Sequence, residues 1–111
     1  MAVNSREKGK RGELELAAEL RKYGYEARRG QQFKGGADSP DVVCAGLDDF
    51  HIEAKNTERT DLYGWMEQAR RDAAEGKTPI VAHKKNRKGW LVVMTLDDFL
   101  ARTLLIGTRH E

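Results

Sequence analysis

Hydrophobic residues recur along the chain with two spacings, which predict its helices and strands. Recurrence every three or four residues predicts helices over residues 6–23, between Thr60 and Gly76, and over residues 96–105. Short apolar runs and period-two alternation predict strands over residues 25–29, 41–45, 50–55, 79–83 and 90–94. The order αβββαββα predicts an α/β (α+β) fold, with helices on a central mixed five-stranded sheet.

Residues suited to helix ends support these boundaries. Side chains that can cap a helix N-terminus precede the three helices: Ser5, Thr60 and Thr95. Asp98 follows Thr95 at the spacing of a capping box. Gly24 and Gly76 can end the first two helices. Residues 30–39 contain three glycines and are expected to form a loop.

One acidic residue of the first helix lies in line with its apolar side chains. Glu13 shares a helical face with Leu16, Ala17 and Leu20, at positions i, i+3, i+4 and i+7. A carboxylate facing the core costs free energy unless it is paired or bound to a cation. Glu13 is therefore a candidate functional residue.

Two more carboxylates lie on neighbouring strands. Asp41, directly after Pro40, begins one strand. The connection of residues 46–49 returns the next strand antiparallel beside it, and period two places Glu53 and Lys55 on one face of that strand. We expect the two carboxylates to meet at one edge of the sheet.

Two close carboxylates repel each other unless they share a divalent cation. Lys55 can then orient a water molecule or stabilise negative charge on a phosphorus atom. His51 lies on the face of Glu53, and we interpret it as a structural residue. The alternative is that Asp41 and Glu53 are ordinary strand-end acids and Lys55 is their surface salt-bridge partner.

The net charge of +2 is unevenly distributed along the chain. Residues 1–37 carry nine basic and five acidic side chains, residues 38–67 two and eight, and residues 68–111 nine and five. Two basic flanks around an acidic centre suit a protein that holds a polyanion and presents carboxylates to a cation. A solvated surface of mixed charge is the alternative.

Composition excludes several classes of protein. Cys44 is the single cysteine, which excludes a disulfide framework and a cysteine-based zinc site and fits a reducing compartment. The apolar runs are too short for a membrane span or a signal-peptide core. With 111 residues, 39% of them hydrophobic, we expect a single cytoplasmic domain over residues 1–111.

The residues Pro40-Asp41 and Glu53-Ala54-Lys55 match the PD-(D/E)XK motif of a large nuclease superfamily. The first helix, from Lys8 through Leu16, resembles that of archaeal-type Holliday junction resolvases within it. Three shorter stretches are also similar: Leu62-Tyr63, Pro79-Ile80-Val81 and Gly89-Trp90. The small size further suggests related phage and prophage endonucleases. The resemblance implies a restriction-endonuclease-like core and a Mg²⁺-dependent endodeoxyribonuclease.

By this resemblance Glu13, Asp41, Glu53 and Lys55 form the catalytic set. Asp41, Glu53 and the backbone carbonyl of Ala54 would bind Mg²⁺, for which Mn²⁺ can substitute, and Glu13 is a candidate additional ligand.

Basic residues on both flanks are candidates for contact with DNA: Lys8, Lys10, Arg11, Arg28, Arg29, Lys34, Lys84, Lys85, Arg87 and Lys88. Three further residues are candidate accessory groups: Gln68, Ser39 and Phe33. The expected substrate is a branched DNA, most specifically a four-way junction resolved by symmetric nicks. The alternatives are a phage nickase, a flap or single-strand-directed endonuclease of the same superfamily, and a non-catalytic DNA-binding module of the same fold.

Symmetric nicks on two strands require two active sites, and one chain of this size carries one. We therefore expect a homodimer with two-fold symmetry. Apolar residues near the second helix and the C-terminus are candidates for its interface: Leu62, Tyr63, Trp65, Leu104, Leu105 and Ile106.

Overall fold

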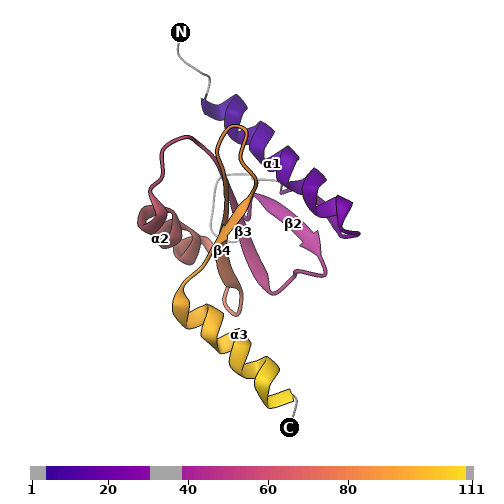
Figure 1. Ribbon diagram of the computed structural model, residues 1–111, viewed down its shortest axis with the longest axis vertical. Helices are drawn as coiled ribbons and strands as arrows, with labels where there is room; N and C mark the ends of the chain where they lie inside the picture. Colours follow the sequence, from indigo (N-terminus) through magenta and orange to yellow (C-terminus); the bar gives the residue numbers. More distant parts are fainter. Residues whose placement is uncertain (1–4, 31–38, 110–111) are drawn as a thin grey trace.

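Within residues 5–30 and 39–109, which the computed structural model describes, five strands form one mixed sheet with three helices (Figure 1). The helices are α1 (Ser5–Lys22), α2 (Leu62–Asp72) and α3 (Leu96–Arg109). The strands lie side by side in chain order: β1 (Glu26–Arg29), β2 (Val42–Ala45), β3 (Phe50–Asn56), β4 (Thr78–Lys84) and β5 (Leu91–Val93). The predicted order αβββαββα is confirmed, and each strand lies within one residue of its predicted ends.

The parallel pair β3 and β4 forms the centre of the sheet, and the other neighbouring strands are antiparallel. Its register runs from Phe50 paired with Thr78 to Asn56 paired with Lys84. Parallel strands need a crossover connection, and the segment containing α2 supplies it. Both central strands therefore end at the same edge of the sheet.

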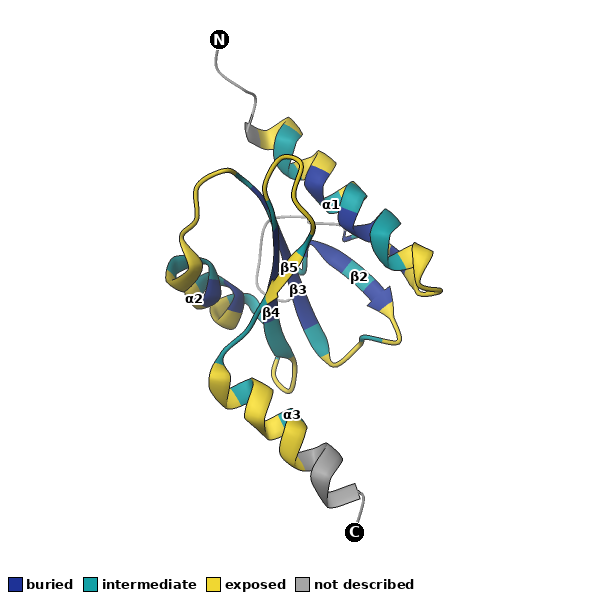
Figure 2. Ribbon diagram, viewed as in Figure 1, coloured by how far each residue is buried: buried dark blue, intermediate teal, exposed yellow. Residues whose placement is uncertain are grey.

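Helices α1 and α2 cover opposite faces of the sheet (Figure 2). Met66 and Ala69 of α2 pack against Val81 on one face. Glu53 pairs with Val81, so Glu53 and Lys55 also face α2. On the other face α1 packs against small and branched side chains of the sheet, in a cluster formed by Leu16, Ala17, Ala27, Val42, Cys44, Ile52, Ala54, Ile80 and Ala82. The predicted alternation of β3 between two faces is confirmed.

The C-terminal end of α1 follows the prediction. Gly24 has a φ of 93°, its N–H donates to Arg21 O at 3.0 Å, and Tyr25 N–H donates to Leu20 O at 3.3 Å. These bonds satisfy carbonyls that would otherwise lack partners at the helix end. The helix begins at Ser5 itself, so this residue stands at the first helical position and not before it.

The ends of α2 correct two predictions. Asp61, and not Thr60, is the N-cap, and its carboxylate accepts the Gly64 N–H at 3.2 Å. The helix ends at Asp72, because Ala73 already has an extended backbone, with φ −71° and ψ 136°. Gly76, with φ 87°, therefore shapes the turn before β4 and does not end the helix.

The start of α3 confirms the predicted cap, since Thr95 Oγ1 accepts the Asp98 N–H at 3.1 Å. The helix continues to Arg109, beyond the predicted end at residue 105. None of the described helices combines the length and the apolar character needed to span a membrane.

A glycine allows α1 to cross closely over the end of β3. A Cβ atom on Gly12 would lie only 2.6 Å from the Cβ of Asn56. The Asn56 side chain in turn donates to Lys8 O at 3.4 Å. Because Glu13 directly follows Gly12, this crossing holds the predicted functional acid of α1 near the edge where β3 ends.

Gly12→Ala is expected to lower the free energy of unfolding by about 1–2 kcal/mol, because the steric clash outweighs the better helix propensity of alanine. Gly9→Ala is the matched control in the same helix, since nothing lies within 4 Å of an added Cβ there. This control should gain up to about 1 kcal/mol. Urea unfolding measures both variants, and equal stabilisation of the two would contradict the close crossing.

Candidate active site

Asp41 attaches to β3 on both sides of Glu53. Its N–H donates to Ile52 O at 2.9 Å, and its Oδ2 accepts the Ala54 N–H, also at 2.9 Å. Asp41 and Glu53 are both buried, with exposed fractions of 8% and 4%. The two predicted carboxylates are therefore held together at the start of β2, as the hairpin led us to expect.

The end of β1 fixes where Asp41 begins its strand. Gly30 N–H donates to Asp41 O at 2.8 Å. A Cβ on Gly30 would lie 2.1 Å from Pro40 O, so only glycine allows this approach. The loop of residues 30–39 thus starts and ends at neighbouring points, and its middle, residues 31–38, lies outside the described residues.

Glu53 shares a hydrogen bond with His51, with 2.6 Å between Oε2 and Nε2, and both side chains are almost completely buried. Burial raises the pKa of the Glu53 carboxyl above its ordinary value, the hydrogen bond to His51 lowers it, and the charge of Asp41 raises it. Two negative charges, on Asp41 and Glu53, thus destabilise each other in this buried place, and a bound cation would relieve the repulsion. His51 is a partner of the acidic centre and more than a packing residue.

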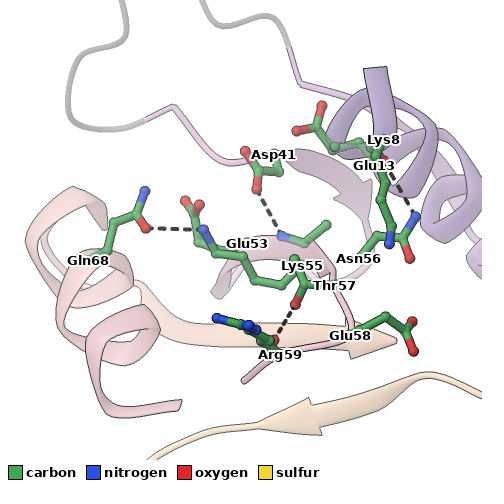
Figure 3. A pocket seen from close by; sticks show the side chains of 12 residues that line it. Lys8, Glu13, Asp41, Glu53, Lys55, Asn56, Thr57, Glu58, Arg59 and Gln68 are labelled. Atoms are coloured by element: carbon green, nitrogen blue, oxygen red, sulfur yellow. Dashed lines mark hydrogen bonds between the residues drawn. The ribbon is translucent and has the colours of Figure 1, made fainter. Parts of the chain in front are cut away.

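Lys55 completes the predicted motif on the same face of β3. Its Nζ donates to Gln68 Oε1 of α2 at 3.2 Å (Figure 3). Gln68, proposed from the sequence as an accessory group, therefore holds the lysine beside the acids.

These side chains line one open cleft of about 760 Å³ between α1, α2 and the end of β3. Its walls contain Lys8, Gly9, Glu13, Asp41, Glu53, Ala54, Lys55, Asn56, Thr57, Glu58, Arg59 and Gln68. All four residues of the predicted catalytic set lie in it.

Glu13 enters the cleft from α1 and is paired with Arg29 of β1, at 2.6 Å between Oε1 and Nε. Burial raises the pKa of Glu13 above its ordinary value, the hydrogen bond from Arg29 lowers it, and the nearby charge of Asp41 raises it. The ion pair with Arg29 thus offsets the free-energy cost of burying the Glu13 carboxylate. Arg29 was predicted to contact DNA, and in the structure it pairs with Glu13.

The acidic centre consists of a pair of carboxylates and not of a cluster. Among residues 5–30 and 39–109, no group of three or more His, Cys, Asp and Glu side chains is arranged to hold a metal ion. Asp41 and Glu53 are the pair, and Glu13 is bonded to Arg29. Glu13 as an additional metal ligand stays a prediction.

The basic turn between β4 and β5 lies on the rim of the cleft. Asn86 N–H donates to Glu58 Oε2 at 2.7 Å, which ties the turn to a wall residue of the cleft. Lys85, Arg87 and Lys88 are exposed there. Lys84 instead pairs with Glu15 of α1 at 2.9 Å and lies 5.9 Å from the centre of the Trp90 ring.

The remaining candidates for DNA contact are spread over the molecule. Lys8 lines the cleft, and Lys10 and Arg11 are exposed on α1. Arg28 lines a separate hollow at the β1 edge, so the structure does not bring it to the cleft. Ser39 is half-buried and is not among the residues that line the cleft. Phe33 and Lys34 lie outside the described residues.

Residues 56–59 are the part of the cleft that sequence reasoning missed. They follow Glu53-Ala54-Lys55 directly at the end of β3, and Thr57 Oγ1 donates to Arg59 O at 2.6 Å. Arg59 is exposed and adds a basic side chain that was not among the candidates. Binding sites of sheets with parallel strands often lie in the loops at the carboxyl ends of those strands. The position of residues 56–59 directly after β3 could therefore have indicated them from the sequence.

Comparison with known proteins agrees with this geometry. A family model described as "Phage putative PDDEXK endonuclease" matches residues 4–107. No curated protein and no solved structure gives a significant match. The matched range includes the whole sheet, all three helices in part or in full, and every residue of the cleft. The chain therefore belongs to this family of PD-(D/E)XK phage endonucleases.

Proposed function

We propose that this endonuclease hydrolyses phosphodiester bonds of branched DNA, preferentially four-way junctions, with Mg²⁺ as its cofactor. The observation that carries the catalytic part is the attachment of Asp41 to β3 on both sides of buried Glu53, with Lys55 on the same cleft wall. This arrangement places two hard anionic groups and one ammonium group together.

The donor set fits a hard divalent cation. Asp41 and Glu53 would hold it together with the Ala54 carbonyl, and carboxylate and carbonyl oxygens suit Mg²⁺ or Mn²⁺ better than softer ions. The raised pKa of Glu53, caused by burial and by the Asp41 charge, means that a cation here would relieve an unfavourable pair of charges. When bound, the ion supplies Lewis acidity toward a phosphoryl oxygen and water.

The other side chains have separate tasks in this proposal. Lys55, held by Gln68, stabilises the negative charge that develops around phosphorus. His51 holds one oxygen of Glu53, so that the carboxylate keeps a single orientation. Glu13 and Arg29 form the α1 wall and keep the local charge balanced.

The choice of branched DNA rests on the resemblance of the first helix and motif to junction resolvases and on the exposed basic turn at the cleft rim. Resolution into two duplexes requires two nicks, so the proposal includes a homodimer acting in the cytoplasm of the host cell. A nickase or a flap-directed enzyme is the second candidate. A non-catalytic module is disfavoured by the complete acid, acid and lysine set in one cleft.

Asp41→Asn and Glu53→Gln are expected to lower cleavage about a hundredfold or more, because each removes a negative charge that would hold the cation. DNA binding should stay equal or tighten, since a negative charge near the phosphates is lost. End-labelled DNA is incubated with Mg²⁺, Mn²⁺ or excess EDTA, with exposed Asp49→Asn as the matched control. Full cleavage in EDTA would remove the proposed mechanism.

The same gel distinguishes the candidate substrates. A four-way junction, a Y-fork, a nicked duplex and a linear duplex are compared side by side, and symmetric cutting of the junction is the expected result. Preference for the Y-fork or for single strands would favour the nickase or flap enzyme. Binding without cleavage under every metal condition would leave the non-catalytic module.

His51→Ala is expected to raise the Mg²⁺ concentration needed for half-maximal cleavage by about 10–100-fold, because Glu53 loses the partner that orients it. His51→Gln retains an N–H donor and should recover part of the loss. Thermal unfolding in EDTA separates this effect from lost stability. An unchanged metal requirement in His51→Ala would mean that the hydrogen bond only supports packing.

Replacing Lys85, Arg87 and Lys88 with glutamine is expected to reduce the dependence of DNA affinity on salt, by up to about 0.9 in slope per lost phosphate contact. The control replaces three exposed basic residues outside the cleft: Lys22, Arg71 and Lys77. Both triple variants lose the same net charge. If their slopes are equal, the turn has no specific part in binding.

A further inference from the structure

Helix α3 turns its polar side toward the rest of the protein. Arg102 lies over the Phe50 ring, 4.0 Å from its centre, and donates to Thr78 Oγ1 at 3.4 Å. Asp98, on the same side of the helix, is half-buried. The helix extends beyond the sheet, and most of its described surface is exposed (Figures 1 and 2).

The opposite side of α3 is an apolar stripe that faces solvent. Leu96, Phe99, Leu100 and Leu104 share one face, with exposed fractions of 68%, 54%, 46% and 69%. Helices of soluble domains normally turn such a stripe toward the core, and a helix of this length is marginal without packing. An exposed apolar stripe of this kind is typical of an interaction surface.

We propose that the α3 stripe is the dimer interface, covered by α3 of a second copy of this chain running antiparallel around a two-fold axis near Leu100. Leu96 and Leu104 lie four residues on either side of Leu100, so the three leucines of the stripe map onto one another under that rotation. Each Leu96 then meets the partner's Leu104. An arbitrary partner would not require this symmetry.

The apolar surface continues from the stripe into a groove of about 580 Å³ between α2 and the start of α3. Its lining includes Leu62, Tyr63, Met66, Val93 and Leu96, and Tyr63 is 88% exposed. In the antiparallel arrangement the last turn of the partner's helix passes Leu96 and reaches this groove. Leu96 belongs to both the stripe and the groove, so the two form one continuous apolar surface, of the kind found at the centre of the roughly 800 Å² that each partner of a stable complex buries.

The position of α3 leaves both active sites open. The helix contacts Phe50 and Thr78, at the beginning of β3 and β4. The cleft and the basic turn lie at the other end of these strands, near Asn56 and Lys84. Pairing through α3 therefore presents two clefts on the outer ends of one particle. In this respect the inference rests on the proposed function, which needs two nicks.

Trp65, another predicted interface residue, is held differently from Leu62 and Tyr63. Trp65 packs in the core cluster with Met66, Ala69 and Val81, and its ring lies 4.9 Å from that of His83. It is half-buried, and it is not among the residues that line the groove. The side chains of Leu105 and Ile106 are outside the described ones.

The first test is the mass of the free protein by size exclusion with light scattering, from micromolar to high-micromolar concentration. The wild type should approach twice 12.6 kDa. Leu100→Glu should return the mass to a monomer, whereas Ala101→Glu, an exposed position outside the stripe, should remain dimeric. Circular dichroism checks folding. A monomeric wild type, a larger open assembly, or a dimer insensitive to Leu100→Glu would overturn the proposal.

Cross-linking tests the arrangement without destabilising the helix. Under mild oxidation Leu100→Cys should form a disulfide-linked dimer, and Ala101→Cys should not, while the native Cys44 is buried. Leu96→Cys and Leu104→Cys should cross-link when mixed but not alone. Cross-linking of Leu96→Cys with itself would overturn the antiparallel pairing. Neither test uses DNA, so a failed interface and a failed nuclease assignment give separate results.

Discussion

The site depends on how Asp41 is joined to β3. Its backbone N–H and its carboxylate form hydrogen bonds to the residues on either side of Glu53, each at 2.9 Å. In a regular ladder the Ala54 N–H would bond to a backbone carbonyl, but here a side chain of the neighbouring strand accepts it. The start of β2 is thereby pinned to β3, and the two buried carboxylates are held together despite their repulsion.

Residues of β1, α1 and α2 position the other groups around the attachment of Asp41 to β3. Gly30 lets β1 approach Pro40 and so sets where β2 begins, and Gly12 lets α1 cross β3 closely enough for Glu13 to enter the cleft. Gln68 of α2 holds Lys55 from the other side. Segments that are distant in sequence thus meet around the end of a single central strand, where a shift in any one of them would move a charged group.

The molecule carries two different surfaces at opposite ends of its central strands. The cleft and the exposed basic turn lie at the end of β3 and β4, and α3 with its apolar stripe lies at their beginning. Charged and apolar groups need different surroundings, because removing an unpaired charge from water costs free energy, whereas apolar groups gain free energy when water is excluded. Their separation along the parallel strands lets both surfaces exist on one small domain.

Local sequence patterns were sufficient for the elements and for the centre of the motif. Hydrophobic spacing marks all eight helices and strands of the described chain, and period two places Glu53 and Lys55 on one face, because both follow from backbone geometry alone. Other features depend on which element covers which face, and these only the tertiary structure decided. Arg29 pairs with Glu13, and Lys84 pairs with Glu15, across elements that are distant in sequence. The bond between His51 and Glu53 follows from their burial under a neighbouring layer, and the apolar stripe of α3 faces outward because Arg102 and not the stripe contacts the sheet. The N-cap of α2 is Asp61 and not the predicted Thr60. Both side chains can accept a hydrogen bond from the first turn of a helix, and which of them does so depends on the residue at which the helix begins.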